Sequence, residues 1–249
     1  MLTEENRDKM LKHITVPFHD NFVSNGVFTI VRYSSRYFLI SAYHCVVGYE
    51  DGEFLSSLNF LMENTGGKKW ITPKVEAMYY NKKESIDLVA FDVDSSFLEK
   101  YIQKEAIDVL ESAENVTKRK DEHAFLQSFS QEDGREISFA SDGVLILKLN
   151  TTAIGGKINY EDHSNIIIKV PEGPEYRGFS GSAVYVKSDN DDLIFIGLAR
   201  QWNRYTSEIH VTALHTVVKF LEACLKQDPH SYFRKLSGAT IPTKEIDLD

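Results

Sequence analysis

Residues 178–186 read GFSGSAVYV, which places Ser180 between Gly178 and Gly181 immediately before an apolar strand. Glycines around a serine let the backbone turn sharply, so that the hydroxyl is exposed and neighbouring N–H groups point at one place. A nucleophile with an oxyanion hole has these requirements. The same composition is typical of an ordinary β-turn, and this stretch taken alone favours the turn.

Two further stretches carry polar groups at the ends of apolar strands. Residues 39–46 read LISAYHCV and contain His44, and residues 86–91 read IDLVAF and contain Asp87. A carboxylate embedded in an apolar strand needs a partner, and a serine hydroxyl is a poor nucleophile without an adjacent base. Taken singly, His44 is equally well a core histidine and Asp87 a cap at the start of a strand. The three stretches together indicate one catalytic group.

The boxes SAYHC, IDLVAF and GFSGSA, in the order His, Asp, Ser, resemble the trypsin-like, chymotrypsin-fold serine peptidases over about residues 20–225. The absence of a local disulfide and of an activation sequence makes the resemblance nearer to the bacterial and intracellular branches than to the digestive enzymes. It implies an all-β fold of two six-stranded antiparallel β-barrels with a C-terminal helix, and a site in the cleft between the barrels.

The resemblance also assigns roles to residues. It makes Ser180 the nucleophile, His44 its general base and Asp87 the group that orients the histidine, with the N–H groups of Gly178 and Ser180 as the oxyanion hole. In this family the substrate pocket is formed by the segment before the serine and by the strand after it. The expected pocket residues here are Pro174, Glu175, Arg177, Ala199, Arg200 and Gln201.

The short apolar runs with turn signals between them independently favour an all-β sandwich or barrel. We expect an N-terminal helical segment (1–19, helix over 4–13), a barrel with His44 and Asp87 (20–112), a linker (113–122), a barrel with Ser180 and a terminal helix (123–227, helix over 213–226), and a tail without a core pattern (228–249). Residues 95–112 also show helical spacing.

Composition, charge and the absence of certain motifs argue against several classes of protein. The 249 residues carry a net charge of −9, which makes binding to nucleic acid improbable by charge repulsion. No apolar run approaches the roughly 20 residues that cross a bilayer. Metal and nucleotide motifs are absent, so we expect neither a metal nor a cofactor. Two cysteines, Cys45 and Cys224, and a charged N-terminus without a secretory pattern predict a cytoplasmic protein.

The predicted function is that of a serine endopeptidase acting on protein or peptide substrates. The alternative is a catalytically silent binding module with the chymotrypsin fold, and an esterase of the α/β-hydrolase type conflicts with the residue order. Phe179 stands where digestive relatives have an aspartate that orders the oxyanion loop through an ion pair. Two alternatives follow for this loop: it is mobile and ordered by an activating protein partner, or it is preordered by packing of Phe179 and Tyr176.

Overall fold

The structure is a computed structural model that describes residues 2–18, 26–47, 59–64, 67–71, 74–95, 105–129, 135–139, 145–149, 151–172, 176–227, 232–236 and 239–248. The helices are α1 (Glu4–Lys12), η1 (Tyr43–Val46), α3 (Val109–Asn115), η2 (Val116–Lys118) and α4 (Leu214–Lys226). The strands are β1 (Ile14–Phe18), β2 (Phe28–Tyr33), β3 (Arg36–Ala42), β4 (Asn59–Asn64), β5 (Gly67–Ile71), β6 (Val75–Asn81), β7 (Leu88–Val93), β8 (Ile107–Asp108), β9 (Arg119–Phe129), β10 (Arg135–Phe139), β11 (Leu145–Leu149), β12 (Thr151–Glu161), β13 (Asn165–Lys169), β14 (Ala183–Ser188), β15 (Leu193–Asn203), β16 (Glu208–Ala213), β17 (Tyr232–Leu236) and β18 (Ala239–Glu245).

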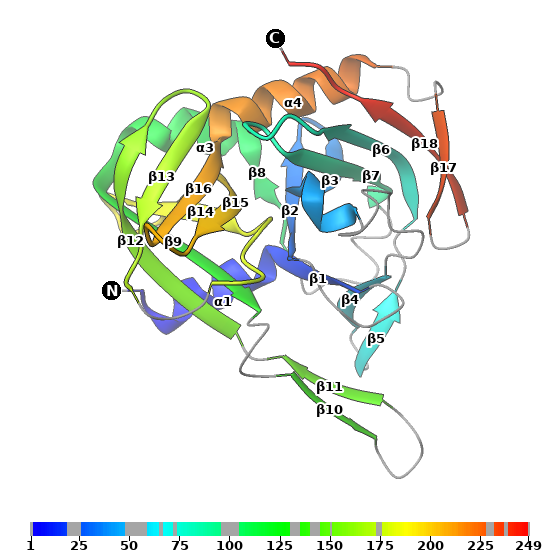
Figure 1. Cartoon of the computed structure of the whole chain (residues 1–249), viewed down its shortest axis with the longest axis horizontal. Helices are drawn as coiled ribbons and strands as arrows, with labels where there is room; N and C mark the ends of the chain where they lie inside the picture. Colours follow the sequence, from blue (N-terminus) through cyan, green and yellow to red (C-terminus); the bar gives the residue numbers. More distant parts are fainter. Residues whose placement is uncertain are drawn as a thin grey trace.

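The second half of the chain forms a closed barrel, which occupies the left of Figure 1. Its six strands follow the order β12-β13-β16-β15-β14-β9, and every neighbouring pair is antiparallel. Alternate residues of these strands point inward, because side chains of a strand alternate between its faces. The buried cluster inside includes Leu126, Ile168, Val184, Ile196 and Val211. The closed barrel of the prediction is thus present around the Ser180 half of the chain.

The second closed barrel that the sequence predicted is not confirmed, because the strands of the first half join β17 and β18 in an open sheet. Its order is β17-β18-β6-β7-β3-β2-β1-β4-β5, with β8 paired to β2. A strand has two edges, and β6 uses one for β7 and the other for β18. Within the part of the chain that the structure describes, β6 therefore has no edge left with which to close the sheet.

Three predicted segments differ from the structure. Residues 113–122, expected as a linker, hold the end of α3, then η2 and the first residues of β9. Of the helix expected over 95–112, residues 96–104 lie outside the described residues, and the described remainder contains β8 and the start of α3. The expected tail contains β17 and β18, because backbone groups on the edge of β6 were available to pair with it.

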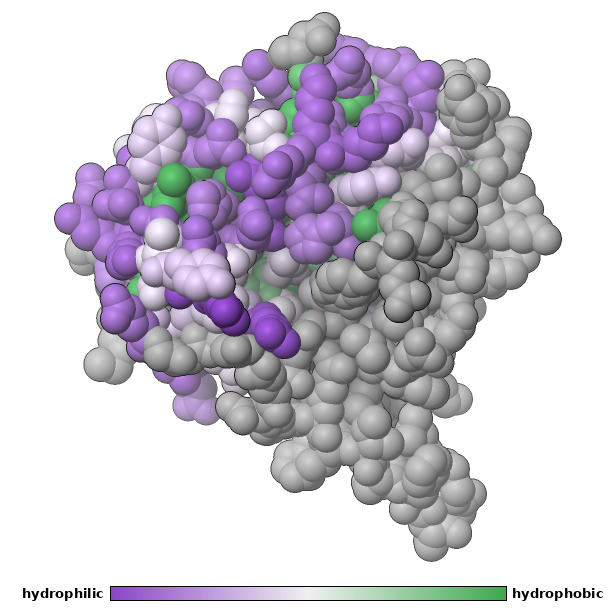
Figure 2. Space-filling view, in the orientation of Figure 1, coloured by the Kyte–Doolittle hydropathy of each residue, from purple (hydrophilic) through white to green (hydrophobic). Residues whose placement is uncertain are grey.

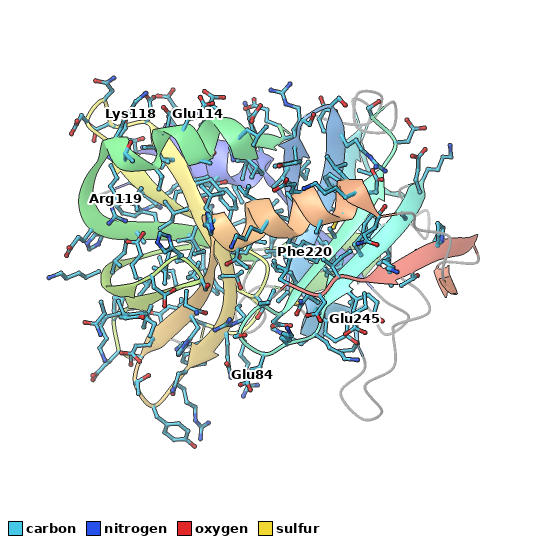
Figure 3. All side chains as sticks on the ribbon, turned by 90° about the horizontal axis from the view of Figure 1, so that it is seen from above. Glu84, Glu114, Lys118, Arg119, Phe220 and Glu245 are labelled. Carbon is cyan, nitrogen blue, oxygen red and sulfur yellow. The ribbon has the colours of Figure 1, made fainter. Side chains whose placement is uncertain are left out.

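Helix α4 lies over both halves of the molecule (Figures 1 and 3). It covers the range in which the sequence predicted a helix, and its apolar face is buried. Phe220 belongs to a buried cluster that also holds Phe38 and Tyr79 from the open sheet and Tyr185 and Phe195 from the barrel. The two halves therefore share this hydrophobic cluster, which α4 covers, in addition to the cluster inside each half.

The described surface in Figure 2 is mainly hydrophilic, with apolar residues visible only as small separate areas. A search of the described residues for a helix of sufficient length and apolarity to span a bilayer finds none.

Candidate active site

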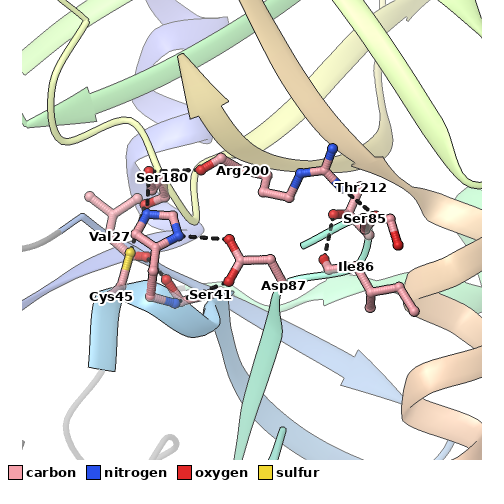
Figure 4. A network of polar contacts seen from close by, with 10 residues as sticks. Val27, Ser41, Cys45, Ser85, Ile86, Asp87, Ser180, Arg200 and Thr212 are labelled. Atoms are coloured by element: carbon pink, nitrogen blue, oxygen red, sulfur yellow. Dashed lines mark hydrogen bonds and ion pairs between the residues drawn. The ribbon is translucent and has the colours of Figure 1, made fainter. Parts of the chain in front are cut away.

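The three residues singled out in the sequence come together where the barrel meets the open sheet (Figure 4). His44 lies in η1, directly after β3, Asp87 lies just before β7, and Ser180 lies in the loop before β14. His44 Nδ1 is 2.6 Å from Asp87 Oδ2, and His44 Nε2 is 3.0 Å from Ser180 Oγ. These contacts form one continuous chain of polar atoms from carboxylate to hydroxyl.

Asp87 holds the histidine at two points. Its Oδ1 accepts a hydrogen bond of 3.1 Å from the backbone N–H of His44, while Oδ2 contacts the ring. Its backbone has φ +48°, in the left-handed region. Such a conformation persists in a non-glycine residue when the surroundings hold it. The N–H of Tyr43 donates to the Asp87 carbonyl at 3.0 Å, and the N–H of Asp87 donates to the Lys83 carbonyl at 2.8 Å.

The loop that carries Ser180 is fastened to the open sheet. Gly181 has φ +84°, and a Cβ built on it would lie 2.0 Å from the Val27 carbonyl oxygen, so only glycine fits. The N–H of Val27 donates to the Ser180 carbonyl at 2.9 Å, and Thr29 Oγ1 donates to the Gly181 carbonyl at 2.7 Å. The open sheet thus sets the position of the serine backbone.

The Ser180 hydroxyl has two acceptors within reach but only one proton. They are His44 Nε2 at 3.0 Å and the carbonyl oxygen of Arg200 at 2.9 Å. With a neutral His44, the hydroxyl can donate to Nε2. With a protonated ring, Nε2–H donates to Oγ and the hydroxyl turns to Arg200. The histidine's protonation state therefore selects the direction of the serine proton.

The charge state of His44 is governed by opposing effects. Burial disfavours the imidazolium, but the hydrogen bond to Asp87, together with the nearby Cys45 sulfur and the carboxylate's charge, outweighs it and raises the pKa of His44 above its ordinary value. A raised pKa makes His44 a stronger base in its neutral form. Cys45 itself is a buried free thiol, as is Cys224.

The two donors expected to form the oxyanion hole are the backbone N–H groups of Gly178 and of Ser180 itself. The N–H groups of Gly178 and Ser180 donate to no other group of the described chain, so both are available to an oxygen atom. Gly178 has φ +85°, and its carbonyl accepts a hydrogen bond of 2.6 Å from Ser128 Oγ, which holds the neighbouring peptide.

Phe179 is packed rather than exposed. Its ring meets that of Tyr176 edge to face, with 5.9 Å between centroids, and both side chains are 3% exposed. The hydroxyl of Tyr176 donates to the Pro171 carbonyl at 3.0 Å. Packing between the two rings therefore supplies contacts in the segment directly before Ser180.

A cavity of about 190 Å³ opens next to Ser180. Its lining includes four of the expected pocket residues, Arg177, Ala199, Arg200 and Gln201, whereas Pro174 and Glu175 lie outside the described residues. Phe179 and Ile209 also line it, and the sequence did not assign them to the pocket. Ile209 enters from β16, the neighbour of β15 in the barrel, and strand order has no local signal in the sequence.

The Arg200 side chain does not present its charge to the cavity as a substrate-reading group would. Its guanidinium is turned away from Ser180 and donates to the carbonyl of Ser85 (Figure 4). It also donates to Asn165 Oδ1. Among the described side chains, no three His, Cys, Asp or Glu residues gather in a way that would hold a metal ion.

Comparisons with known proteins describe the fold. No protein-family model and no curated protein matches the chain. Among solved structures, it is similar to a Glu endopeptidase in complex with MPD, with a TM-score of 0.53 and 13% identity over 87% of this chain and 91% of that one.

A second similar chain comes from a structure concerned with aromatic interactions that drive the coupled folding and binding of the intrinsically disordered Sesbania mosaic virus VPg protein. It matches with a TM-score of 0.51 and 9% identity over 84% of this chain and 90% of that one. At such identities the likeness shows the fold alone. Together with the closed six-stranded barrel, it shows a chymotrypsin-like fold.

Proposed function

We propose that this chain is a serine endopeptidase that hydrolyses peptide bonds of protein substrates through an acyl-enzyme. The observation that carries the proposal is the chain of polar contacts from Asp87 through His44 to Ser180, with 2.6 Å and 3.0 Å between successive atoms. A half-buried carboxylate, an oriented imidazole and a half-buried serine in a loop match the requirements of an activated hydroxyl nucleophile.

Acylation begins when Ser180 Oγ attacks the carbonyl carbon of the scissile peptide. Neutral His44 accepts the hydroxyl proton at Nε2 and then delivers it to the departing amine, so that the C–N bond breaks as an ester to Ser180 forms. Asp87 accepts the hydrogen bond from Nδ1–H, which fixes the tautomer and stabilises the imidazolium formed during the step.

The carbonyl oxygen becomes negatively charged as Ser180 attacks. The N–H groups of Gly178 and Ser180, which are free of other partners in the described chain, would bind this oxygen. One such donor contributes about 3 kcal/mol to stabilising the transition state. In deacylation, His44 removes a proton from water, the hydroxide attacks the ester, and Ser180 regains its proton.

The fold supports this assignment over an α/β-hydrolase esterase. The α/β-hydrolase fold is built on a mainly parallel sheet. Among the described strands, only two pairs are parallel, β2 with β8 and β18 with β6. The Glu endopeptidase shows that a structure of similar fold supports peptide hydrolysis. A catalytically silent binding module remains the alternative, because a shared fold does not determine activity.

The direct test is covalent labelling by a fluorophosphonate, followed by mass spectrometry of the labelled peptide. The wild-type chain is expected to be labelled at Ser180, and Ser180→Ala is expected to abolish labelling. Ser182→Ala is the matched control, because Ser182 is a buried neighbour whose hydroxyl has no hydrogen-bond partner among the described residues. Its loss should leave labelling and peptide cleavage unchanged.

Cleavage of a peptide library by the same three chains then tests the reaction itself. Hydrolysis by wild type and Ser182→Ala but not by Ser180→Ala supports the proposal. A folded wild-type chain that is neither labelled nor active would contradict it and favour the binding module. Cleavage that appears only with a protein partner would show that the loop bearing Phe179 needs ordering; we expect turnover without one, because Phe179 and Tyr176 are already packed.

A further inference from the structure

The turn that presents Asp87 is held by side chains of the barrel. Arg200 Nη1, from β15, donates to the carbonyl of Ser85. Thr212 Oγ1, from β16, donates to the carbonyl of Ile86 at 2.8 Å. The next carbonyl, that of Asp87 itself, accepts from the N–H of Tyr43. Three successive carbonyls of this turn are therefore each bonded to a donor from another element, and two of the donors belong to the barrel.

Both barrel residues are buried and directed at this turn. Arg200 is 9% exposed and Thr212 is fully buried. Arg200 also donates from Nη1 to Asn165 Oδ1 of the barrel strand β13 at 3.3 Å, which holds the guanidinium from the barrel side. A long charged side chain is rarely buried in this way without a partner, because removing its charge from water is costly. Its contacts here lead to the Asp87 turn and not to the substrate cavity.

We propose that Arg200 and Thr212 are positioning residues that hold the Ser85–Asp87 turn in the one conformation that lets Asp87 reach His44. The catalytic consequence of this inference rests on the proposed function, whereas the positioning itself does not. Asp87 needs a left-handed backbone to reach both the N–H and the ring of His44, and such a conformation requires support from its surroundings.

The guanidinium has a second, electrostatic effect. The charged groups that face it are Asp87 and Glu84, whose attraction partly offsets the burial that lowers the pKa of Arg200. A cation behind Asp87 opposes a second positive charge on His44. Loss of the Arg200 charge therefore favours protonation of His44, whereas loosening of the turn, which weakens the contact between Asp87 and His44, opposes it.

Four variants of the full chain separate these effects. Arg200→Met removes the donor and the charge but keeps an apolar stem, and Arg200→Lys keeps the charge. Thr212→Val removes the donor with little change in shape, and Thr212→Ser restores a hydroxyl. The backbone carbonyl of Arg200, which accepts from Ser180, is present in all of them.

The matched controls are Arg204→Met and Thr216→Val. Arg204 is an exposed arginine that stacks on Tyr205. Thr216 is a buried threonine on α4 whose hydroxyl donates to the His163 carbonyl at 3.5 Å, away from the Asp87 turn. Neither control should alter the geometry around His44.

The first readout is the proton NMR resonance of His44 Nδ1–H, which the short contact to Asp87 shifts far downfield. We expect it to move upfield or vanish by exchange in Arg200→Met and Thr212→Val, and to persist in Thr212→Ser and both controls. Retention of the resonance in Arg200→Met and Thr212→Val, in chains that remain folded by circular dichroism, would overturn the inference. This readout does not depend on activity.

The second readout is peptide hydrolysis. Arg200→Met is expected to lower kcat by about 10²-fold with KM nearly unchanged, the size of loss that small misplacement of a catalytic group causes. The acid limb of the pH profile of Arg200→Met should lie at higher pH than that of Arg200→Lys, because both substitutions loosen the turn and only the second keeps the charge. A raised KM with unchanged kcat would instead make Arg200 a substrate-binding residue and overturn the inference. An inactive wild type with the expected NMR changes would reject the proposed function while supporting the positioning role.

Discussion

At the scale of single residues, the proposed function makes the Asp87 carboxylate the group that sets the pH range in which His44 can act as a base. The contact to Asp87 raises the pKa of His44, so the imidazolium persists to higher pH than in a free histidine. Only the neutral ring can accept the Ser180 proton. Activity should therefore rise with pH, and the midpoint of its acid limb should lie above the ordinary histidine pKa of about 6.5.

Asp87→Asn tests this relationship. The amide cannot stabilise the imidazolium and favours the wrong tautomer, so we expect kcat to fall by about 10⁴-fold and the remaining acid limb to move to lower pH. The measurement is kcat/KM across pH, which reports the pKa of the free enzyme. An acid limb that stays in place in the variant would show that Asp87 does not set the charge state of His44.

Some residues of the candidate site can be predicted from the sequence and others cannot, for a physical reason. His44, Asp87 and Ser180 lie in stretches whose own composition is unusual, namely polar groups at the ends of apolar strands or between glycines. The sequence assigned Arg200 to the substrate pocket by its place after the serine. Where its guanidinium points depends on Ser85 and Asn165, which lie far away in the chain, and Thr212 resembles any other strand threonine.

At the scale of elements, the C-terminal strand stabilises the sheet that carries Asp87. β18 runs parallel to β6, and the residue after it, Ile246, donates to the Tyr80 carbonyl at 2.8 Å. Its own carbonyl accepts from Asn81 Nδ2 at 2.7 Å, and its side chain is buried. This segment is therefore part of the core.

Ile246→Ala is expected to lower the free energy of unfolding by about 2–4 kcal/mol, as for other buried isoleucines. The measurement is chemical denaturation followed by far-ultraviolet circular dichroism. Tyr205→Ala, at a side chain that is 85% exposed, serves as the control and should stay within about 0.5 kcal/mol of wild type. An equally small effect at Ile246 would mean that the C-terminal strand is dispensable.

The sequence did not reveal this strand because its stabilising contacts are not local. Residues 239–245 read ATIPTKE, with one large apolar side chain among polar ones, and a central proline weakens any strand pattern. The strand forms because β6 offers an open edge. By contrast, the stripe of α4 is visible in the sequence, because its helical periodicity records which face is buried.

At the scale of the whole molecule, the shared core predicts that the barrel and the open sheet unfold together. Phe220 packs in a cluster with residues of both halves. Native-state hydrogen exchange should therefore give the same opening free energy for the most protected amides of β7 and of β15. Phe220→Ala should lower both by the same amount, about 3–5 kcal/mol.

Two different opening free energies, or a loss confined to one strand in Phe220→Ala, would contradict this prediction and show that the halves unfold independently.

The number of closed barrels could not be predicted from the sequence, because closure of a sheet depends on contacts between distant strands. The number of strands can be estimated from local patterns. Whether the sheet closes depends on which strand pairs with its last free edge, and here β18 pairs with the free edge of β6.

Each half of the molecule holds a reactive group of the other. Val27 and Thr29 of the open sheet fasten the loop of Ser180, and Arg200 and Thr212 of the barrel fasten the turn of Asp87. When only the first half of the chain has been synthesised, His44 and Asp87 are present, but Ser180 is not, and the barrel residues that hold the Asp87 turn are also missing. Under the proposed function, the group that would cut peptide bonds is assembled only once both halves have been synthesised and have docked.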